Sequence, residues 1–307
     1  MDRTPAYVAV DWGTSSFRLW TLAADGAVLG ERRSHEGAVA AAGIGFEAVL
    51  EAHLAALGVP DGVPVMMCGM VGSRAGWVEA AYLDAPVRLE RLAAQATSVP
   101  STRRTVRILP GIAQRPPAAP DVMRGEETQL LGLEPGLRRA CLPGTHSKWV
   151  GLADGEVTGF STFATGELFQ LLRGAPTLAP ALAGAEAVDP QSAAFAGAVA
   201  DALESPARFG NHVFALRAGW LLAGTPAADT LARLSGLLIG LELAGAAREG
   251  PLDGTALVAS GPAAALYGRA LDLSGARNVT LHDAERCVRR GLAAAAAAAF
   301  LHEGATR

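Results

Sequence analysis

The sequence has almost no lysine and is poor in charge. Of its 26 basic residues, 25 are arginine and a single one, Lys148, is lysine. Charged residues make up 18% of the 307 positions, and the formal net charge is -4. Proteins that hold nucleic acid through its phosphates carry a basic surface. The charge balance therefore excludes that class of partner, and we expect no nucleic-acid binding.

Cysteines are few, and membrane or secretion signals are missing. Cys68, Cys141 and Cys287 are widely separated and form no CxxC pair, which argues against both a disulfide framework and a zinc site. The nearly pure apolar run 292–301 is shorter than the ~20 residues of a membrane span, so we expect a buried helix there. With no leader-like segment before the first strand, we expect a cytoplasmic protein without a membrane contact.

Length and proline placement predict two α/β domains. A chain of 307 residues corresponds to about two domains, and the segment RPPAAPD at 115–121 holds three prolines that neither a helix nor a central strand accommodates. We therefore expect domains at 1–117 and 118–307. The hydrophobic pattern predicts strands at 7–10, 17–22, 27–31, 63–68, 106–109, 256–259 and 279–282, and helices at 46–57, 126–133 and 227–247.

The opening of the chain recurs in its second half. YVAVDWGTSSFRLWTLAADGAVLG is echoed by RACLPGTHSKWVGLADGEVTGF, each with a strand, a Gly-Thr-x-Ser turn, a second strand, an Asp-Gly turn and a third strand. Both domains are thus expected to begin with the same hairpins. The matching turn positions are Gly13 with Gly144, Thr14 with Thr145, and Ser16 with Ser147.

Such turns have the chemistry of anion sites. A glycine followed by hydroxyl residues turns backbone N–H groups and O–H donors toward one point, and two such turns predict a polyphosphate held from both sides. Asp11, just before the first turn, is placed to hold magnesium beside phosphates. Lys148 follows the second turn and is suited to a phosphate or carboxylate as a point charge, although a solvent-facing lysine fits the same pattern. A P-loop is excluded, because no GxxxxGK[ST] segment occurs.

These motifs resemble those of a known family. DWGTSSFR, GTHSK and LVASGPAAALY look like the phosphate-1, phosphate-2 and adenosine motifs of sugar kinases related to actin and Hsp70-type chaperones. Four longer segments, CGMVGSRAGWVEAAY, MRGEETQLLG, LPGTHSKWV and FSTFATGELFQLL, are similar to the 2-dehydro-3-deoxygalactonokinase family, in the same order along nearly the whole chain. The resemblance implies two RNase H-like lobes with an ATP and substrate cleft between them.

The resemblance also implies an activity and its cofactors. It implies ATP- and Mg²⁺-dependent phosphorylation of 2-dehydro-3-deoxy-D-galactonate at the 6-hydroxyl, a step of galactonate degradation. Phosphoryl transfer needs phosphate positioning, a metal and a group that orients and deprotonates the attacking hydroxyl. The implied phosphate and ATP contacts are Gly13, Thr14, Ser15, Gly144, Thr145, Ser147, Lys148 and Gly261.

For the catalytic base the resemblance favours Glu126. Related sugar kinases carry a Gly-Asp-Gln motif at the start of a helix in this part of the chain, and Gly125-Glu126-Glu127 stands at that point here. Glutamate replaces the usual aspartate, so Glu127 or Asp11 stays an alternative. Two acidic residues at a helix N-terminus also stabilise the helix dipole, with no catalytic role.

For the sugar acid we expect contacts from Arg74, Ser16, Trp77 and Arg124. Arg74 stands in the glycine-flanked loop 69–76, where related kinases keep an arginine. Aromatic residues at the spacing of Trp77 are also typical of a core, and Arg124 could equally form a surface ion pair. The segment with Thr162, Thr165 and Glu167 is typical of the family, and Thr165 equally fits a helix cap.

Other functions fit parts of the pattern. A kinase for a related sugar acid would carry the same motifs, and a non-catalytic nucleotide-gated sensor would keep the phosphate turns without needing a base. The sequence leaves open the epimer preference, and it leaves open whether the chain is a monomer or a homo-oligomer.

Overall fold

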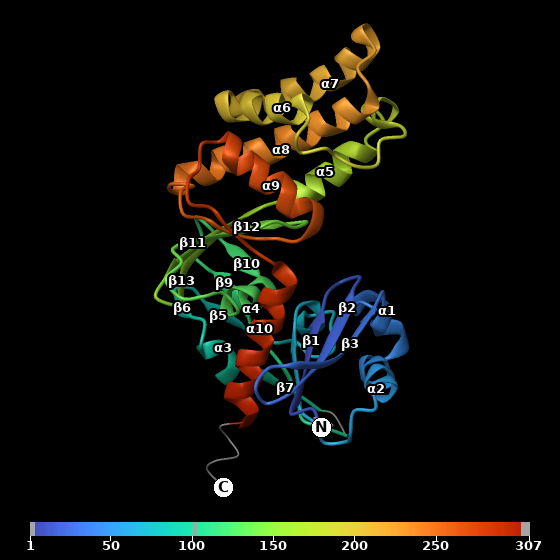
Figure 1. The fold of residues 1–307 in the computed structure, drawn as a ribbon, viewed down its shortest axis with the longest axis vertical. Helices are drawn as coiled ribbons and strands as arrows, with labels where there is room; N and C mark the ends of the chain where they lie inside the picture. The colour runs from blue at the N-terminus through green and yellow to red at the C-terminus, as the bar shows by residue number, and fades with distance from the viewer. Residues whose placement is uncertain (1–3, 101–102, 302–307) are drawn as a thin grey trace. The chain divides into compact units, whose positions relative to one another are not determined.

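The computed structural model describes residues 4–100 and 103–301. These residues divide into two compact units. Of the described residues, unit 1 comprises 4–100, 103–136, 152–160 and 283–301, and unit 2 comprises 137–151 and 161–282. Both are α/β units (Figure 1), and each is described by itself.

Unit 1 is built on a twisted sheet whose central strands are almost entirely apolar. Its order is β3-β2-β1-β4-β8-β7; β1 pairs antiparallel with β2 and parallel with β4, and β4 parallel with β8. β1 and β4 are buried on both faces, as continuous apolar runs in parallel sheets are. The bounds are β1 Tyr7–Trp12, β2 Phe17–Leu22, β3 Val28–Ser34, β4 Val65–Cys68, β7 Thr97–Val99 and β8 Val106–Ile108.

Helices and a smaller sheet complete unit 1. α2 turns its apolar side onto the main sheet through Val49, Leu50 and Leu54. A three-stranded sheet has the order β10-β9-β5, and β13 pairs with β6. The bounds are α1 Ala38–Ile44, α2 Phe46–Ala56, η1 Met70–Gly72, β5 Tyr82–Asp84, β6 Val87–Arg88, α3 Arg91–Ala94, β9 Gly111–Gln114, β10 Asp121–Met123, α4 Glu126–Leu131, β13 Glu156–Phe163, α10 Ala284–Ala296 and η4 Ala297–Leu301.

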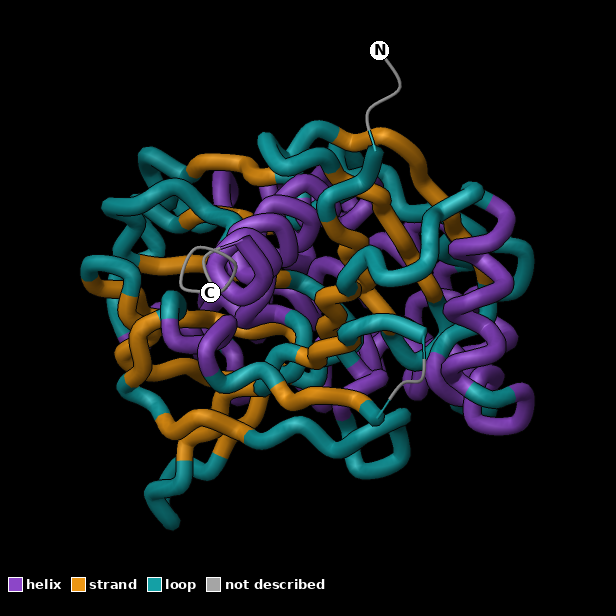
Figure 2. Tube along the Cα trace, turned by 90° about the horizontal axis from the view of Figure 1, so that it is seen from below, coloured by secondary structure: helices purple, strands orange, loops and turns teal. Residues whose placement is uncertain are grey.

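Helix α10, near the C-terminus, packs against α4, β1 and β4. Figure 2 views this helix nearly along its axis. Glycines make the crossing with α4 very close. A Cβ on Gly291 would lie 1.9 Å from the Thr128 carbonyl oxygen, and a Cβ on Gly132 would lie 1.9 Å from the Cys287 carbonyl oxygen. The element with the candidate base is therefore held directly by the last helix.

Unit 2 joins a sheet to a helical layer. β11 pairs antiparallel with β12 and parallel with β14, which pairs parallel with β15. The long helix α8 lies beside α6 and α7 (Figure 1). The bounds are β11 Arg139–Leu142, β12 Ser147–Ala153, α5 Thr165–Gly174, η2 Ala179–Leu182, α6 Ala193–Glu204, η3 Pro206–Arg208, α7 Phe209–Ala223, α8 Ala227–Glu249, β14 Ala256–Val258, α9 Gly261–Leu273 and β15 Thr280–His282.

The strand arrangement explains the repeat in the sequence. The series β2-β1-β4-β8 of unit 1 and β12-β11-β14-β15 of unit 2 share one pattern, an antiparallel pair followed by two parallel neighbours. The Gly-Thr-x-Ser turns join β1 to β2 and β11 to β12. The predicted antiparallel pair around each turn, β1–β2 and β11–β12, is therefore present in both units.

Helix α8 needs separate mention because of its composition. Within the described residues it is the single helix long and apolar enough to cross a membrane, apart from the sharply bent pair α1 and α2. However, 72% of its apolar window is buried inside the protein, where it contributes to both cores of unit 2. Its apolar character is that of a core helix.

The units differ in extent from the domains expected at 1–117 and 118–307. The proline-rich segment lies in the loop of the antiparallel hairpin β9–β10, inside unit 1. Residues 118–136 and α10 also pack in unit 1. Proline marks a place where regular structure stops, and a hairpin loop meets that requirement as well as a domain boundary does.

Candidate active site

The first Gly-Thr-x-Ser turn is closed by its own backbone and by a helix. The Gly13 amide donates to the Ser16 carbonyl at 2.9 Å, while the Gly13 carbonyl accepts from Ala38, the first residue of α1, at 2.9 Å. Thr14 and Ser15 are exposed and Ser16 is half-buried. A Cβ on Gly37 would lie 2.4 Å from the Thr14 carbonyl oxygen. The turn thus presents its hydroxyl residues to solvent while α1 holds its carbonyls.

The second turn is built in the same way. The Thr145 carbonyl accepts from the amide of Glu167 in the first turn of α5 at 3.0 Å. A Cβ on Gly166 would lie 2.5 Å from the Gly144 carbonyl oxygen. Each turn is therefore held by the start of the helix that follows its hairpins, with a glycine permitting the close approach.

Two predicted phosphate contacts of this turn lie beneath it. Ser147 is fully buried, and its hydroxyl accepts from the Gly144 amide at 3.4 Å and hydrogen-bonds the Tyr267 hydroxyl at 2.9 Å. Lys148 is also buried, in the register pair with Leu142. The Ser147 hydroxyl thus supports the turn from the core side, whereas Thr145 is exposed.

Asp11 lies at the end of β1 in a partly buried ion pair. Its Oδ2 is 2.9 Å from Nη2 of its cross-strand partner Arg18, and Cys68 Sγ points to Oδ1 at 3.9 Å. Burial raises the pKa of Asp11, and Arg18 opposes the rise. Arg18 is also 3.7 Å from Glu285 of α10. Arg18 belongs to the DWGTSSFR motif, but the sequence alone assigned it no role. The hairpin of β1 and β2 places Arg18 directly opposite Asp11.

The two candidate glutamates at the start of α4 lie in different surroundings. Glu126 is half-buried, and its Oε2 accepts from the Arg124 amide at 3.1 Å. Glu127 is completely buried; its carboxylate accepts from the Gly125 amide at 2.7 Å and from Thr128 Oγ1 at 3.1 Å. Burial, and then the charge of Glu126, raise the pKa of Glu127 to about 8.

These groups belong to one cluster. A Cβ on Gly125 would lie 3.6 Å from Gly69 Cα, and a Cβ on Gly69 would lie 3.5 Å from Asp11 Oδ1. Gly69 has a φ of 91° and Gly125 of 113°, left-handed values that favour glycine. The ends of β1 and β4 thus meet the start of α4 in unit 1, which brings Asp11 and Glu126 into one neighbourhood.

The predicted sugar-acid residues are not all part of that cluster. The Arg74 side chain is 91% exposed and lies 3.7 Å from Glu79. Trp77 is half-buried and stacks on Phe46 with 6.1 Å between ring centroids, as part of the unit 1 core.

Arg124 is packed beside the cluster. Its guanidinium lies over the Tyr82 ring, 4.2 Å from the centroid, and donates to the Ala80 carbonyl at 2.8 Å. Its Nη1 is buried and has no hydrogen-bond partner among the residues that the structure describes. Arg124 therefore fixes the segment before α4 against the loop that follows η1.

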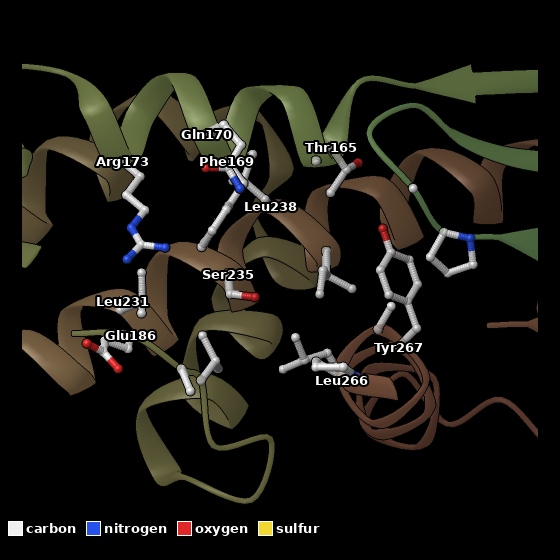
Figure 3. Close-up of a pocket in the computed structure, with 18 residues that line it drawn as sticks. Thr165, Phe169, Gln170, Arg173, Glu186, Leu231, Ser235, Leu238, Leu266 and Tyr267 are labelled. Carbon is white, nitrogen blue, oxygen red and sulfur yellow. The ribbon is translucent and has the colours of Figure 1, made fainter. Parts of the chain in front are cut away.

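Unit 2 holds a pocket of about 460 Å³ beside its Gly-Thr-x-Ser turn. Figure 3 shows Thr165 and Tyr267 at one end and Arg173 and Glu186 at the other. Gly261 begins α9 with a φ of 59° and directly precedes Pro262, which lines the pocket. The lining is mainly apolar and includes Pro143, Gly144, Phe169, Val188, Leu231, Leu238, Ile239, Pro262, Ala263 and Leu266.

Sequence reasoning missed most of this pocket. It singled out Gly144, Thr165 and Gly261, but not Tyr267 or the carboxylate of Glu242 that Tyr267 contacts. A signal was present, because Glu242 is the one charged residue in the otherwise apolar stretch 234–247. A single carboxylate in a core helix has to find hydrogen-bond donors.

No group of three or more His, Cys, Asp or Glu side chains that could hold a metal occurs in the described part of the chain. Mg²⁺ beside a nucleotide usually keeps several waters and takes one or two carboxylates plus phosphate oxygens. Asp11 supplies one carboxylate oxygen of suitable character at the edge of the cluster, and its pairing with Arg18 competes for it. The residues present fit a magnesium ion held mainly by phosphates and water.

Comparison with known proteins gives the family. The profile of the 2-keto-3-deoxy-galactonokinase family matches residues 11–295. A Rhizobium meliloti protein assigned as the 2-dehydro-3-deoxygalactonokinase DgoK1 is 54% identical over 297 residues, which cover 95% of this chain and 97% of that protein. The Escherichia coli 2-dehydro-3-deoxygalactonokinase is 36% identical over 78% of this chain and 80% of that protein.

Solved structures agree on the fold. The crystal structure of a Sinorhizobium meliloti protein assigned as a 2-dehydro-3-deoxygalactonokinase has a TM-score of 0.92 at 54% identity and covers 95% of this chain and 98% of that one. An activator of 2-hydroxyisocaproyl-CoA dehydratase from Clostridium difficile, solved with ADPNP, has a TM-score of 0.53 at 11% identity, covering 98% and 96%, a likeness of fold alone. The predicted actin-like ATPase fold is thereby confirmed. The chain belongs to the 2-keto-3-deoxy-galactonokinase family, and its enzyme class is that of a sugar-acid kinase.

Proposed function

We propose that this enzyme transfers the γ-phosphoryl group of ATP to the 6-hydroxyl of 2-dehydro-3-deoxy-D-galactonate. The observation that carries the proposal is the 54% identity to DgoK1 over 95% of the chain. The geometry supports it, because a phosphate turn, an apolar pocket and a pair of glutamates with different environments are all present.

The pocket of unit 2 is the proposed nucleotide site. Its 460 Å³ falls within the roughly 300–1,000 Å³ of typical small-molecule sites. The apolar middle suits a purine ring, while Gly144 and the start of α5 at Thr165 form the end suited to phosphates. Gly261 would act through its backbone, which turns the chain from β14 into α9.

Glu126 is the proposed catalytic base. A base must reach the hydroxyl that it deprotonates, and Glu126 is half-buried at the start of α4, whereas Glu127 is completely buried. With a pKa of about 8, Glu127 is mostly protonated at neutral pH. A neutral neighbour spares Glu126 a like-charge repulsion, so we assign Glu127 to positioning the helix start.

The remaining assignments follow from the two turns. We propose that Thr14 and Ser15 of the first turn, with Asp11, face the phosphates, and that Mg²⁺ offsets phosphate charge when bound. Ser16 and Arg124 are retained as sugar-acid contacts, because both flank the Asp11 cluster. Arg74 would have to turn from its exposed position to join them. With Cys68, Cys141 and Cys287 all free and buried, we place the enzyme in the cytoplasm.

The test is an ADP-release assay with a panel of 2-keto-3-deoxy sugar acids, run on the wild type and Glu126→Gln. We expect release stimulated most by the galactonate derivative. Loss of the base should lower kcat by about 10²- to 10⁴-fold. Glu134→Gln, at an exposed ion pair with Arg290 in the same unit, is the matched control and should keep wild-type turnover.

The outcomes separate the alternatives. Binding of nucleotide and sugar acid without ADP release would favour the sensor. If another sugar acid stimulated ADP release most, the substrate assignment would change, and the assignment as a sugar-acid kinase would stand. Turnover of Glu126→Gln near the wild-type rate would refute the base assignment and leave the activity standing.

A further inference from the structure

Glu242 is a buried carboxylate in the middle of the apolar helix α8. It is 1% exposed, and three side-chain donors from three other elements point at it. Trp149 Nε1 of β12 donates to Oε1 at 2.8 Å, and the Tyr267 hydroxyl of α9 donates to Oε2 at 2.6 Å. The Thr165 hydroxyl at the start of α5 also donates to Oε2. A charge in such a core helix is costly unless it is hydrogen-bonded, and here the donors are supplied.

The hydrogen bonds continue from Glu242 to the phosphate turn. The Tyr267 hydroxyl has a single proton, which it donates to Glu242 Oε2. Ser147 therefore donates to Tyr267 at 2.9 Å, and the Ser147 oxygen accepts from the Gly144 amide at 3.4 Å. The result is a one-directional chain from the turn to α8, of the kind in which each bond polarises the next.

The same carboxylate fixes both walls of the pocket at this end. Gly144, Thr165 and Tyr267 all line the pocket, and they come from the turn, from α5 and from α9. Figure 3 shows the Thr165 and Tyr267 side chains at the same end of it. Removal of the carboxylate would leave the donors of these elements without their shared acceptor.

We infer that Glu242 is a positioning residue for the nucleotide: through Tyr267, Ser147 and Thr165 it sets the phosphate end of the pocket in unit 2. The inference rests on the proposed nucleotide site and adds to it a residue that does not touch the ligand. Burial raises the pKa of Glu242 while the hydrogen bonds from Thr165, Tyr267 and Trp149 lower it. Ser147 accordingly supports the turn from the core, and Thr145 is the hydroxyl residue of this turn that is exposed to a ligand.

The experiment measures ADP binding by calorimetry and steady-state KM values for ATP and the sugar acid. Glu242→Gln keeps the shape of the side chain but replaces one acceptor oxygen with a donor. We expect its Kd for ADP and KM for ATP to rise about tenfold, equivalent to about 1.4 kcal/mol, with less than about a twofold change in the KM for the sugar acid. Glu249→Gln, on the exposed end of the same helix, should match the wild type.

A second variant keeps the test decisive if Glu242→Gln folds poorly. Tyr267→Phe removes only the hydroxyl that joins Ser147 to Glu242, and we expect a similar rise in the Kd for ADP. Its effect should not add to that of Ser147→Ala, because both break one chain of hydrogen bonds. Calorimetric stoichiometry near one shows that the molecules measured are folded.

Contrary results are distinct for the two proposals. If the wild type binds no ADP, the proposed nucleotide site fails and this inference fails with it. If the wild type binds ADP and both variants bind it equally well, only the positioning role of Glu242 is refuted. A purely structural role would lower the fraction of binding-competent protein, or raise both KM values together, without the selective loss for the nucleotide.

Discussion

At the scale of single residues, the neighbours Glu126 and Glu127 show what a motif leaves undetermined. The Gly-Glu-Glu motif predicts an acidic helix start, and α4 does begin at Glu126. Which glutamate is accessible depends on how α4 rotates against α10, and that follows from the glycine contacts of the crossing. The contacts place Glu127 in the core, beside Thr128 and Cys68.

The raised pKa of Glu127 predicts an unusual pH dependence of stability. Its folded-state pKa of about 8 exceeds the ordinary value of 4.5, so the folded state binds more protons between these two values. The stabilising contribution is full below pH 4.5 and is lost as the pH rises through 8. Glu127→Gln, an isostere of the protonated form, should flatten this decline. Urea unfolding of both proteins at pH 6 and pH 9 measures this change in the free energy of unfolding.

The control for this prediction is Glu79→Gln, since Glu79 is more than half exposed on the surface of the same unit. It should leave the pH profile of the wild type intact. An unfolding free energy of Glu127→Gln that falls with pH as steeply as that of the wild type would contradict the raised pKa.

The two Gly-Thr-x-Ser turns show the same limit at the residue scale. Spacing and residue type predicted both turns, and both join the expected strands. The pattern did not reveal that Ser147 points into the core, because the first four residues of β12 are all buried and show no alternation. Its partner Tyr267 lies 120 residues away, and no local pattern links residues so distant.

At the scale of elements, apolar segments were predictable even where they are short. The expected strands at 17–22 and 256–259 and the helices at 46–57 and 227–247 correspond to β2, β14, α2 and α8. Strands such as β5 and β6 are short and also lack a continuous apolar run, and their pairing depends on tertiary contacts. The crossing of α4 and α10 joins elements separated by more than 150 residues, so no sequence window contains it.

That crossing predicts a sharp steric effect. Gly291→Ala places a Cβ 1.9 Å from the Thr128 carbonyl oxygen, and the helices have to move apart. We expect a loss of about 3 kcal/mol or more in the free energy of unfolding, as in overpacked cores, with reduced kcat because α4 carries Glu126. Urea denaturation and the ADP-release assay measure both effects.

Gly268→Ala in α9 is the matched control. Among the described residues, no atom outside the backbone of this helix and the two chain neighbours lies within 4 Å of a Cβ there, so alanine should be neutral or stabilise the helix by up to about 1 kcal/mol. If Gly291→Ala were as stable as Gly268→Ala, the close approach of α4 and α10 would be refuted.

At the scale of the whole molecule, ligand binding should change stability. ADP that binds only the folded chain stabilises it by about 2.7 kcal/mol at 100 times its Kd. Thermal unfolding with and without ADP measures the shift. Ala263→Trp, which fills the apolar middle of the pocket, should abolish the shift while keeping the melting temperature of the unliganded protein near that of the wild type. An undiminished shift in this variant would place ADP elsewhere.

The fold class was predictable because both units repeat one strand pattern with a recognisable turn, and the extent of the units was not. Contiguous domains are the default expectation from a sequence. Unit 1 instead takes its last helix from the far end of the chain, and the sequence contains no signal for this exchange apart from the amphipathic pattern of α10.

The return of the chain to unit 1 has a consequence for its synthesis on the ribosome. Strand β1 emerges long before α10, which packs on β1 and α4 and is made more than 270 residues later. Domains usually fold in order as they emerge, but here the first unit has to wait until the residues of the second have been made. The second unit, although it begins later, has all of its residues available first.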